Sequence, residues 1–123
     1  IINDITEDRQ GRLWVATNGV GVARLNDDLN DASSNPKKKF LNFRLNNSET
    51  ANRVNAFLFD SQGNLWCATD GGLFRASVDA NGPQHFELIL PYEGEIAMAA
   101  FADREGRLWF GIENQLIEVE ITR

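Results

Sequence analysis

The sequence is poor in the residues that build disulfides, metal centres and membrane spans. Its 123 residues include one cysteine, Cys67, and one histidine, His85. A single cysteine excludes an internal disulfide and leaves the redox compartment open. A single histidine excludes a multi-histidine metal site within one copy of the chain. The longest uninterrupted apolar run, residues 96–102, is far too short to cross a bilayer.

Positive charge is scarce as well. There are 12 Lys and Arg residues against 18 Asp and Glu, so the net charge is −6. This balance argues against nucleic-acid binding, which requires clustered cations, and against docking on an anionic membrane surface. The given sequence does not begin with an initiator methionine, and its first residues show no signal-peptide pattern. We therefore expect the chain to come from a longer or processed parent.

A repeated motif is the most informative feature of the chain. The pattern D-x-x-G-x-L-W occurs three times, at residues 8–14, 60–66 and 103–109, and it contains all three tryptophans. Successive tryptophans are 52 and 43 residues apart, close to the period of roughly 40–50 residues that is typical of propeller blades. The similarity extends to both sides of the motif, because residues 15–19 and 67–71 also correspond.

Each copy predicts a set of short strands. The D-x-x-G segment lies between two apolar runs, as in a β-hairpin loop whose glycine adopts a positive φ and whose aspartate accepts backbone N–H groups. A second turn and a third strand follow, and residues 40–45 and 85–90 predict a fourth strand in the first two copies. Four such strands make the blade of a β-propeller.

The predicted fold class is therefore all-β, with about three blades of four antiparallel strands in a single propeller segment over residues 1–123. Blade 1 spans 1–47 with an inserted loop at 26–39, blade 2 spans 53–91, and an incomplete blade 3 spans 95–123. Closed propellers need roughly 4–8 blades. The chain is thus predicted to be a fragment of a larger propeller or of an oligomeric one, with apolar faces exposed on its terminal blades.

Residues 96–102 and the second strand of each copy each allow a more specific structural prediction. Residues 96–102 are rich in good helix formers, yet they align with the first strands of the other copies, so we predict a strand. In the second strand, Leu and Trp alternate on two apolar faces, which predicts a sheet covered on both sides. Cys67 lies on one of these faces and is expected to be a buried, unreactive thiol.

Most of the conspicuous side chains are predicted to have structural roles rather than catalytic or ligand-binding ones. One active site does not need three equivalent aspartates, so Asp8, Asp60 and Asp103 are predicted to hold turns. The tryptophans are predicted to be core residues rather than sugar platforms, and His85 is predicted to lie at the surface. The acidic residues 27–31 lack the glycine and terminal glutamate of an EF-hand loop, and three lysines at 37–39 are read as part of a solvated loop.

The sequence resembles the two-component regulator propeller repeat family. The resemblance rests on D-x-x-G-x-L-W followed by A-T-x-x-G and a short apolar–Arg strand, at residues 54–75 and, nearly as well, at 2–24. It implies a sensor region of a bacterial histidine kinase, hybrid kinase or diguanylate cyclase. It also implies a periplasmic or other extracytoplasmic location. Some family members sense glycans, so an oligosaccharide or another small molecule is a possible ligand by resemblance.

A propeller ligand is expected at the loops near the mouth of the central channel. The candidates lie in the turns after each second strand and in the connections between blades, and they are Asn18, Asp70, Glu113, Asn114, Arg53 and Tyr92, with Asn52 and Glu93 beside them. Ordinary polar loops are the competing interpretation. We predict no catalytic residue, no metal ligand and no cofactor.

The function predicted from the sequence is a non-enzymatic ligand-sensing or protein-interaction segment of a bacterial two-component signalling receptor. Its partners would be other propeller blades or other copies of the chain, without nucleic acid and without direct membrane contact. Two alternatives remain open. One is part of a propeller-type enzyme, such as a polysaccharide or lactone lyase, and the other is a ring-forming scaffold without ligand.

Overall fold

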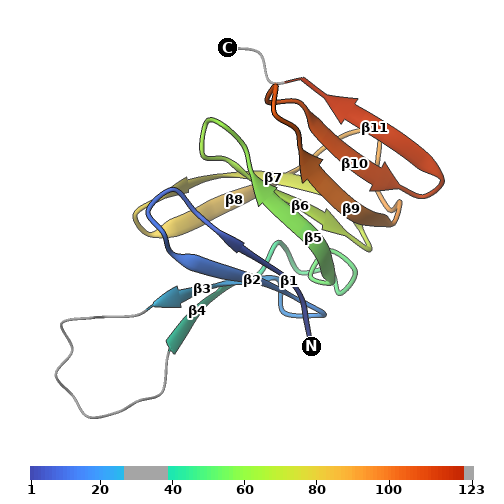
Figure 1. Cartoon of the computed structure of the whole chain (residues 1–123). Helices are drawn as coiled ribbons and strands as arrows, with labels where there is room; N and C mark the ends of the chain where they lie inside the picture. Colours follow the sequence, from blue (N-terminus) through green and yellow to red (C-terminus); the bar gives the residue numbers. More distant parts are fainter. Residues whose placement is uncertain (27–38, 121–123) are drawn as a thin grey trace, which may run out of the picture.

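The computed structural model describes residues 1–26 and 39–120, and within them every regular element is a β-strand (Figure 1). The acidic residues 27–31 and the lysines at 37 and 38, for which loop roles are predicted, lie outside the described residues, as do 121–123. Among the described residues no helix is long and apolar enough to cross a membrane.

Eleven strands form three antiparallel sheets, which we call blades 1, 2 and 3. Blade 1 consists of β1 (Ile2–Glu7), β2 (Leu13–Thr17), β3 (Val22–Asn26) and β4 (Lys39–Phe43). Blade 2 consists of β5 (Val54–Phe59), β6 (Leu65–Thr69), β7 (Gly72–Asp79) and β8 (Gly82–Leu88). Blade 3 consists of β9 (Ala97–Ala102), β10 (Leu108–Ile112) and β11 (Gln115–Val119). The predicted all-β propeller class is confirmed.

The strand predictions differ from the structure mainly at the outer edges. The segment with helix-forming composition is indeed a strand, β9, because its backbone pairs along β10. The fourth strands begin and end earlier than predicted, at residues 39–43 and 82–88 instead of 40–45 and 85–90. In blade 2 the reason is a tight turn after Asp79, where Gly82 has a φ of 100° and already pairs with Asp79.

The blades stack through two apolar cores, with blade 2 in the middle. The Trp14 and Ala16 side of blade 1 packs against the Leu65 and Cys67 side of blade 2. The opposite side of blade 2, with Trp66, packs against blade 3 in the same way. The inner strands β1, β5 and β9 lie next to one another (Figure 1). Blade 2 is therefore covered on both faces.

Cys67 is fully buried in the first of these cores. Burial raises the pKa of its thiol far above the ordinary range, because a thiolate has no solvation there. The predicted burial of this thiol in the core is confirmed. The same is true of the tryptophans in blades 1 and 2, since Trp14 and Trp66 are buried.

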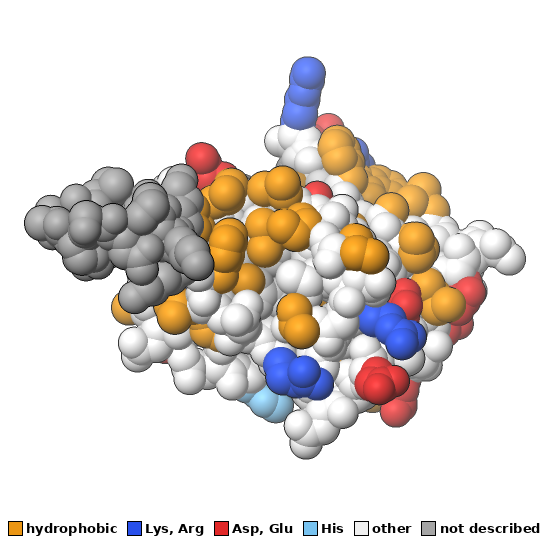
Figure 2. All heavy atoms as spheres, turned by 90° about the horizontal axis from the view of Figure 1, so that it is seen from below, with side chains coloured by type: hydrophobic (Ala, Val, Ile, Leu, Met, Phe, Trp, Pro, Cys, Tyr) orange, Lys and Arg blue, Asp and Glu red, His pale blue; other side chains and the backbone are white. Residues whose placement is uncertain are grey.

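The outer faces of blades 1 and 3 are only partly covered. Leu13 is exposed although it occupies the motif position of the buried Leu65, and Trp109 is half-buried although it corresponds to Trp66. The expectation that the second strand is covered on both sides therefore holds for β6 alone. The expectation that the terminal blades expose apolar faces is confirmed, and Figure 2 shows hydrophobic side chains gathered on one side of the molecule.

Polar side chains at the start of the inner strands join neighbouring blades. The side-chain amide of Asn3 donates to the carbonyl of Val54 over 2.9 Å, and that of Asn55 donates to the carbonyl of Ala97 over 2.8 Å. Both asparagines lie at an irregularity in the strand register. This bulge turns the side chain out of the strand and toward the next blade. The two bonds thus repeat from one interface to the next.

A single buried amide holds the connection between blades 1 and 2. Asn52 is fully buried, and its Oδ1 accepts the N–H of Leu45 over 2.7 Å. Its Nδ2 donates to the carbonyls of Asn46 and Ser48, each over 2.8 Å. Every hydrogen-bonding group of this amide except one lone pair is therefore used inside the loop.

We expect Asn52→Ala to lower the free energy of unfolding by about 1–3 kcal/mol, because it leaves a buried N–H and two carbonyls without partners. Asn47→Ala is the matched control, since Asn47 is an exposed residue of the same connection, and its effect should stay within about 0.5 kcal/mol. Urea unfolding followed by tryptophan fluorescence measures both. Equal losses in the two variants would contradict the assigned role of Asn52.

Candidate functional site

The repeated aspartate is part of the hairpin and not of a reactive centre. In blade 2, Oδ1 of Asp60 accepts the N–H groups of Gln62 and Asn64 over 2.8 and 2.9 Å. Its Oδ2 accepts the indole N–H of Trp66 over 2.8 Å. The glycine of the turn, Gly63, has a φ of 84°, a backbone conformation that favours glycine. The predicted turn-holding role is confirmed, and blades 1 and 3 repeat it with Asp8 and Asp103.

The bond between this carboxylate and the indole is a feature that the sequence analysis missed. It recurs over 2.8 Å between Asp8 and Trp14 and over 2.9 Å between Asp103 and Trp109. A buried indole N–H needs an acceptor, and the constant separation of six residues between aspartate and tryptophan is the signal that could have revealed it. The motif is therefore one hydrogen-bonded unit.

An arginine covers each tryptophan ring. Arg24 and Arg75, from the third strands, lie 5.7 and 5.3 Å from the ring centres of Trp14 and Trp66. In blade 3 the corresponding strand position carries Glu118. There the cation is Arg107 from the turn, 5.7 Å from the Trp109 ring, and it also forms an ion pair of 2.8 Å with Asp103. The positive charge of each guanidinium is attracted to the electron-rich face of the tryptophan ring below it.

These contacts change the acidity of the motif carboxylates. The Trp109 indole, donating to Asp103, is the main cause that lowers the pKa of that carboxyl to about 2, and backbone and Arg107 donors add to it. For Asp8, burial acts to raise the pKa, but the Trp14 indole and Arg12 outweigh it, so the pKa is lowered. Both carboxylates are therefore held ionised.

The predicted ligand-binding residues lie at the opposite end of the sheets. At this end, which we call the loop end, the inner strands begin and the turns after the second strands reverse the chain (Figure 1). Asn18 and Arg53 form a bridge between blade 1 and the blade connection. The N–H of Asp70 donates to the Arg53 carbonyl over 3.1 Å, and Oδ1 of Asp70 accepts the amide of Asn55 over 2.9 Å. Three of the six candidates are thus neighbours.

The remaining candidates lie along the connection between blades 2 and 3. Tyr92 is half-buried against the second core. The N–H of Gly94 donates to the carbonyl of Gly71 over 3.0 Å, so this connection borders the same β6–β7 turn that carries Asp70. Glu113 is bound to Ile96 twice, since its N–H donates to the Ile96 carbonyl and its carboxylate accepts the Ile96 N–H, each over 2.8 Å.

Glu113 is also the one non-glycine residue with positive φ, 52°, in the described part of the chain. Asn114, beside it, is exposed. The sequence analysis places Asn52 beside the candidate ligand-binding residues. This prediction is wrong, because Asn52 is fully buried and cannot contact a ligand. Glu93 is exposed.

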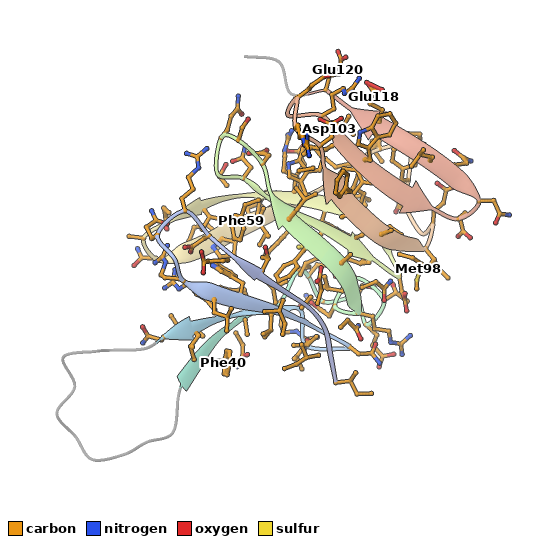
Figure 3. The ribbon with its side chains drawn as sticks, viewed as in Figure 1. Phe40, Phe59, Met98, Asp103, Glu118 and Glu120 are labelled. Carbon is orange, nitrogen blue, oxygen red and sulfur yellow. The ribbon has the colours of Figure 1, made fainter. Side chains whose placement is uncertain are left out.

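Two clefts at the other end of the sheets had no signal in the sequence. One, of about 510 Å³, lies between the motif turns of blades 1 and 2 and is lined in part by Arg9, Arg12 and Phe59. The other, of about 240 Å³, lies between blades 2 and 3 beside Trp66 and Arg75. Phe59 comes from β5 (Figure 3). Its ring stands edge-on to the Trp14 ring, with 5.4 Å between the ring centres. None of the six predicted residues lines either cleft, so the structure separates these two clefts from the predicted site.

The described residues hold no group of three or more His, Cys, Asp or Glu side chains arranged to bind a metal ion. His85 is exposed on β8, as predicted. What the loop end presents is a mixture of carboxylates, amides, one arginine and one phenol. Such groups bind a ligand by hydrogen bonds.

The fold and the repeated motif define a β-propeller segment built of stacked blades. The two-component regulator propeller model matches residues 1–19 and 48–71, so these two segments are similar to the repeat of that family. The matched residues contain the first two copies of the motif, with the turns at Asn18 and Asp70. No curated protein matches the chain by sequence.

Solved structures share the fold at low identity. An extracellular domain from B. thetaiotaomicron, described as part of a hybrid two-component system, has a TM-score of 0.72 and 21% identity over 98% of this chain. A second such domain from the same organism has a TM-score of 0.68 and 20% identity over 97% of the chain. The chain spans 15% of the length of each. Virginiamycin B lyase from Staphylococcus aureus has a TM-score of 0.66 and 15% identity over 99% of this chain. The match covers 42% of the lyase chain.

The acidity of Asp103 predicts a stability change in acid. Because its folded-state pKa, about 2, lies below the ordinary value of 3.8, the folded state takes up a proton less readily than the unfolded state. The stabilisation is therefore complete above about pH 4 and is lost as the pH falls through about 2. We expect Asp103→Asn to flatten this part of the curve of unfolding free energy against pH, measured by urea unfolding.

Glu49→Gln provides the control, since Glu49 is an exposed carboxylate in the connection between blades 1 and 2. It should leave the slope between about pH 4 and 2 as it is in the parent protein. If the unfolding free energy of Asp103→Asn fell with pH as steeply as that of the parent protein, the lowered pKa assigned to Asp103 would be contradicted.

Proposed function

We propose that this chain is a non-enzymatic segment of an extracytoplasmic propeller in a bacterial two-component signalling receptor, and that its loop end binds the ligand or partner. The family match supports the receptor assignment, and the likeness to extracellular receptor domains supports the location. The observation that carries the binding site is the convergence of both blade connections on the β6–β7 turn, where Arg53 and Gly94 bond to Asp70 and Gly71.

The chemistry of the loop end fits a ligand rich in hydroxyl groups. The carboxylates of Asp70 and Glu113 accept hydrogen bonds, Asn114 offers both donors and acceptors, and Arg53 supplies a cation. The ring of Tyr92 adds an aromatic surface beside these polar groups. An oligosaccharide or another polyhydroxylated small molecule combines hydroxyls with apolar C–H faces, so it is the ligand class that these residues suit best.

Signal transmission would follow from the position of the site between blades. Asn55 contacts Asp70 of its own blade through one amide hydrogen bond and the carbonyl of Ala97 in blade 3 through another. A ligand that moves Asp70 therefore also alters a bond between blades 2 and 3. Differential binding to two packings of the blades would shift their equilibrium, and the parent protein would pass the shift to its output domain.

The receptor assignment is tested by the reading frame that surrounds Ile1 and Arg123. We expect further D-x-x-G-x-L-W copies, then a membrane span and a kinase or cyclase domain. A frame that encodes a lyase, without any such output domain, would overturn the assignment. It would favour the enzyme alternative, which the fold likeness to virginiamycin B lyase supports.

The binding site is tested on the propeller that this frame encodes. We expect a panel of soluble oligosaccharides, screened by isothermal titration calorimetry, to contain a ligand whose binding weakens at least about tenfold in Arg53→Ala and in Asp70→Asn, since each variant removes a charged hydrogen-bonding group. Arg44→Ala is the matched control, because Arg44 is an exposed arginine of the same connection. Equal affinity in all three variants would place the ligand elsewhere.

A further inference from the structure

Arg24 is a buried cation to which the described residues offer no counter-ion. It lies on β3, opposite Trp14 of β2, and is 6% exposed. Its Nη1 is buried and has no hydrogen-bond partner within residues 1–26 and 39–120, and none of the ion pairs in that part of the chain includes it. The face of the Trp14 ring, 5.7 Å away, attracts the charge. A ring face does not replace the hydrogen bonds that a guanidinium makes in water, so the charge is incompletely stabilised.

Blade 2 shows the same arginine position with its counter-ion in place. Arg75 corresponds to Arg24, because each lies opposite the motif tryptophan of its own blade. Nη2 of Arg75 donates to Oε2 of Glu87 over 3.0 Å, and Glu87 is the residue opposite Arg75 on β8. On blade 1 the residue opposite Arg24 is Leu41, whose side chain has no acceptor. The more deeply buried of the two arginines is therefore the one that lacks a carboxylate.

The motif carboxylate of blade 1, Asp8, has no acceptor left for Arg24. Its Oδ1 accepts the backbone N–H groups of Gln10 and Arg12 over 3.0 and 2.9 Å. Its Oδ2 accepts Nε of Arg12 and the indole N–H of Trp14 over 2.9 and 2.8 Å. These four bonds use the acceptor sites of an ionised carboxylate. Burial lowers the pKa of the Arg24 guanidinium, the charge of Arg12 lowers it further, and Asp8 acts against both.

Arg24 lies beside the cleft of about 510 Å³ between blades 1 and 2, since two residues whose charges act on it, Asp8 and Arg12, line that cleft. Phe59, labelled in Figure 3, lines it from β5 and stands edge-on to the Trp14 ring that Arg24 covers. A hollow of this volume accommodates a small molecule. Both of its walls come from blades that face each other inside the described chain, so the cleft does not depend on what lies beyond either end of the sequence.

The charge around the cleft favours a single negative group. Arg9 is exposed and lines the cleft together with Arg12. The wall formed by blade 2 carries Asp79, whose Oδ1 accepts a backbone N–H of its own turn over 2.8 Å. The three arginines at the cleft thus exceed its two aspartates by one positive charge, although the whole chain has a net charge of −6.

We propose that this cleft binds a small carboxylate-bearing molecule whose carboxylate pairs with Arg24, as the carboxylate of Glu87 pairs with Arg75. One carboxylate balances the single excess positive charge, whereas a doubly charged phosphate would exceed it. Arg24 is recessed between two blades, so a small molecule reaches it more readily than the surface of a folded partner does. The cleft lies at the end of the sheets opposite to the loop end, and the proposal does not depend on the ligand proposed there.

Isothermal titration calorimetry on the propeller that the surrounding frame encodes tests the site. The probes are acetate, succinate and glucuronate, with glucose as the neutral counterpart of the last. We expect carboxylate binding that weakens at least about tenfold in Arg24→Met, because this variant removes the charged donor and keeps an apolar chain over the Trp14 ring. Arg75→Met is the matched control and should bind the probes as the parent does, since Arg75 is already paired.

Arg53→Ala separates this site from the one proposed at the loop end, and it should leave carboxylate binding at the cleft unchanged. Binding that is lost in Arg53→Ala but kept in Arg24→Met would assign the probe to the loop end and overturn the present proposal. The absence of binding by all three carboxylates would overturn it as well, without bearing on the loop end. So would an equal loss of affinity in Arg24→Met and Arg75→Met.

Leu41→Glu tests the site without removing the arginine. Leu41 is 39% exposed, and a carboxylate there lies opposite Arg24 as Glu87 lies opposite Arg75. We expect a higher urea midpoint of unfolding than in the parent, and carboxylate affinity at least about tenfold weaker, because the cation is then paired within the chain. Leu41→Gln, which has the same length without the charge, is the matched control and should keep the affinity.

The stability of Arg24→Met in the absence of probe distinguishes a binding residue from a structural one. Replacing an unpaired buried charge by an apolar side chain should raise the urea midpoint or leave it unchanged. Circular dichroism of each variant checks that the blades remain folded. A lower midpoint in Arg24→Met together with full carboxylate affinity in Leu41→Glu would show that Arg24 only packs on the tryptophan, and the proposal would fail.

Discussion

A hydrogen bond between an aspartate carboxylate and a tryptophan indole, 2.8 Å long at Asp60 and Trp66, joins the turn of a hairpin to the face of its sheet. The other carboxylate oxygen accepts two backbone N–H groups of the same turn. With its N–H satisfied, the indole can be buried between blades without the cost of an unpaired donor. Hairpin geometry and blade stacking are therefore set by one side-chain pair, and its repetition makes one blade resemble the next.

Stacking decides which equivalent residues become core and which remain on the surface. Leu65 and Leu13 hold the same position in the motif, but only Leu65 has a neighbouring blade over it. The polar contacts between blades follow the same order, since Asn3 and Asn55 each reach across to the next inner strand. At the loop end no such repetition operates. Asn18, Asp70 and Glu113 occupy related turns with different side chains, and the binding site that we propose there depends on this diversity.

Most of the fold could be predicted from the sequence, because its signals are local and occur more than once. The aspartate, glycine and tryptophan of each motif act within seven consecutive residues, and strand β9 could be assigned against its helical composition by alignment with β1 and β5. The candidate site was less accessible. That Asn18, Arg53 and Asp70 are neighbours followed from the blade topology, but the burial of Asn52 did not, since its partners are carbonyls and an N–H of an irregular connection. The clefts beside Arg9 and Arg75 had no signal, because each is lined by residues of two different blades that are far apart in the sequence.

The sequence by itself determined the class of the protein, the number of its strands and the turn-holding role of its aspartates, since all of these arise from contacts between residues close in the chain. Only the tertiary structure decided which faces are covered, which asparagines join the blades and where the hollows lie. These depend on contacts such as that of Asn55 with Ala97, 42 residues apart, and no local pattern specifies the distance or orientation between two sheets.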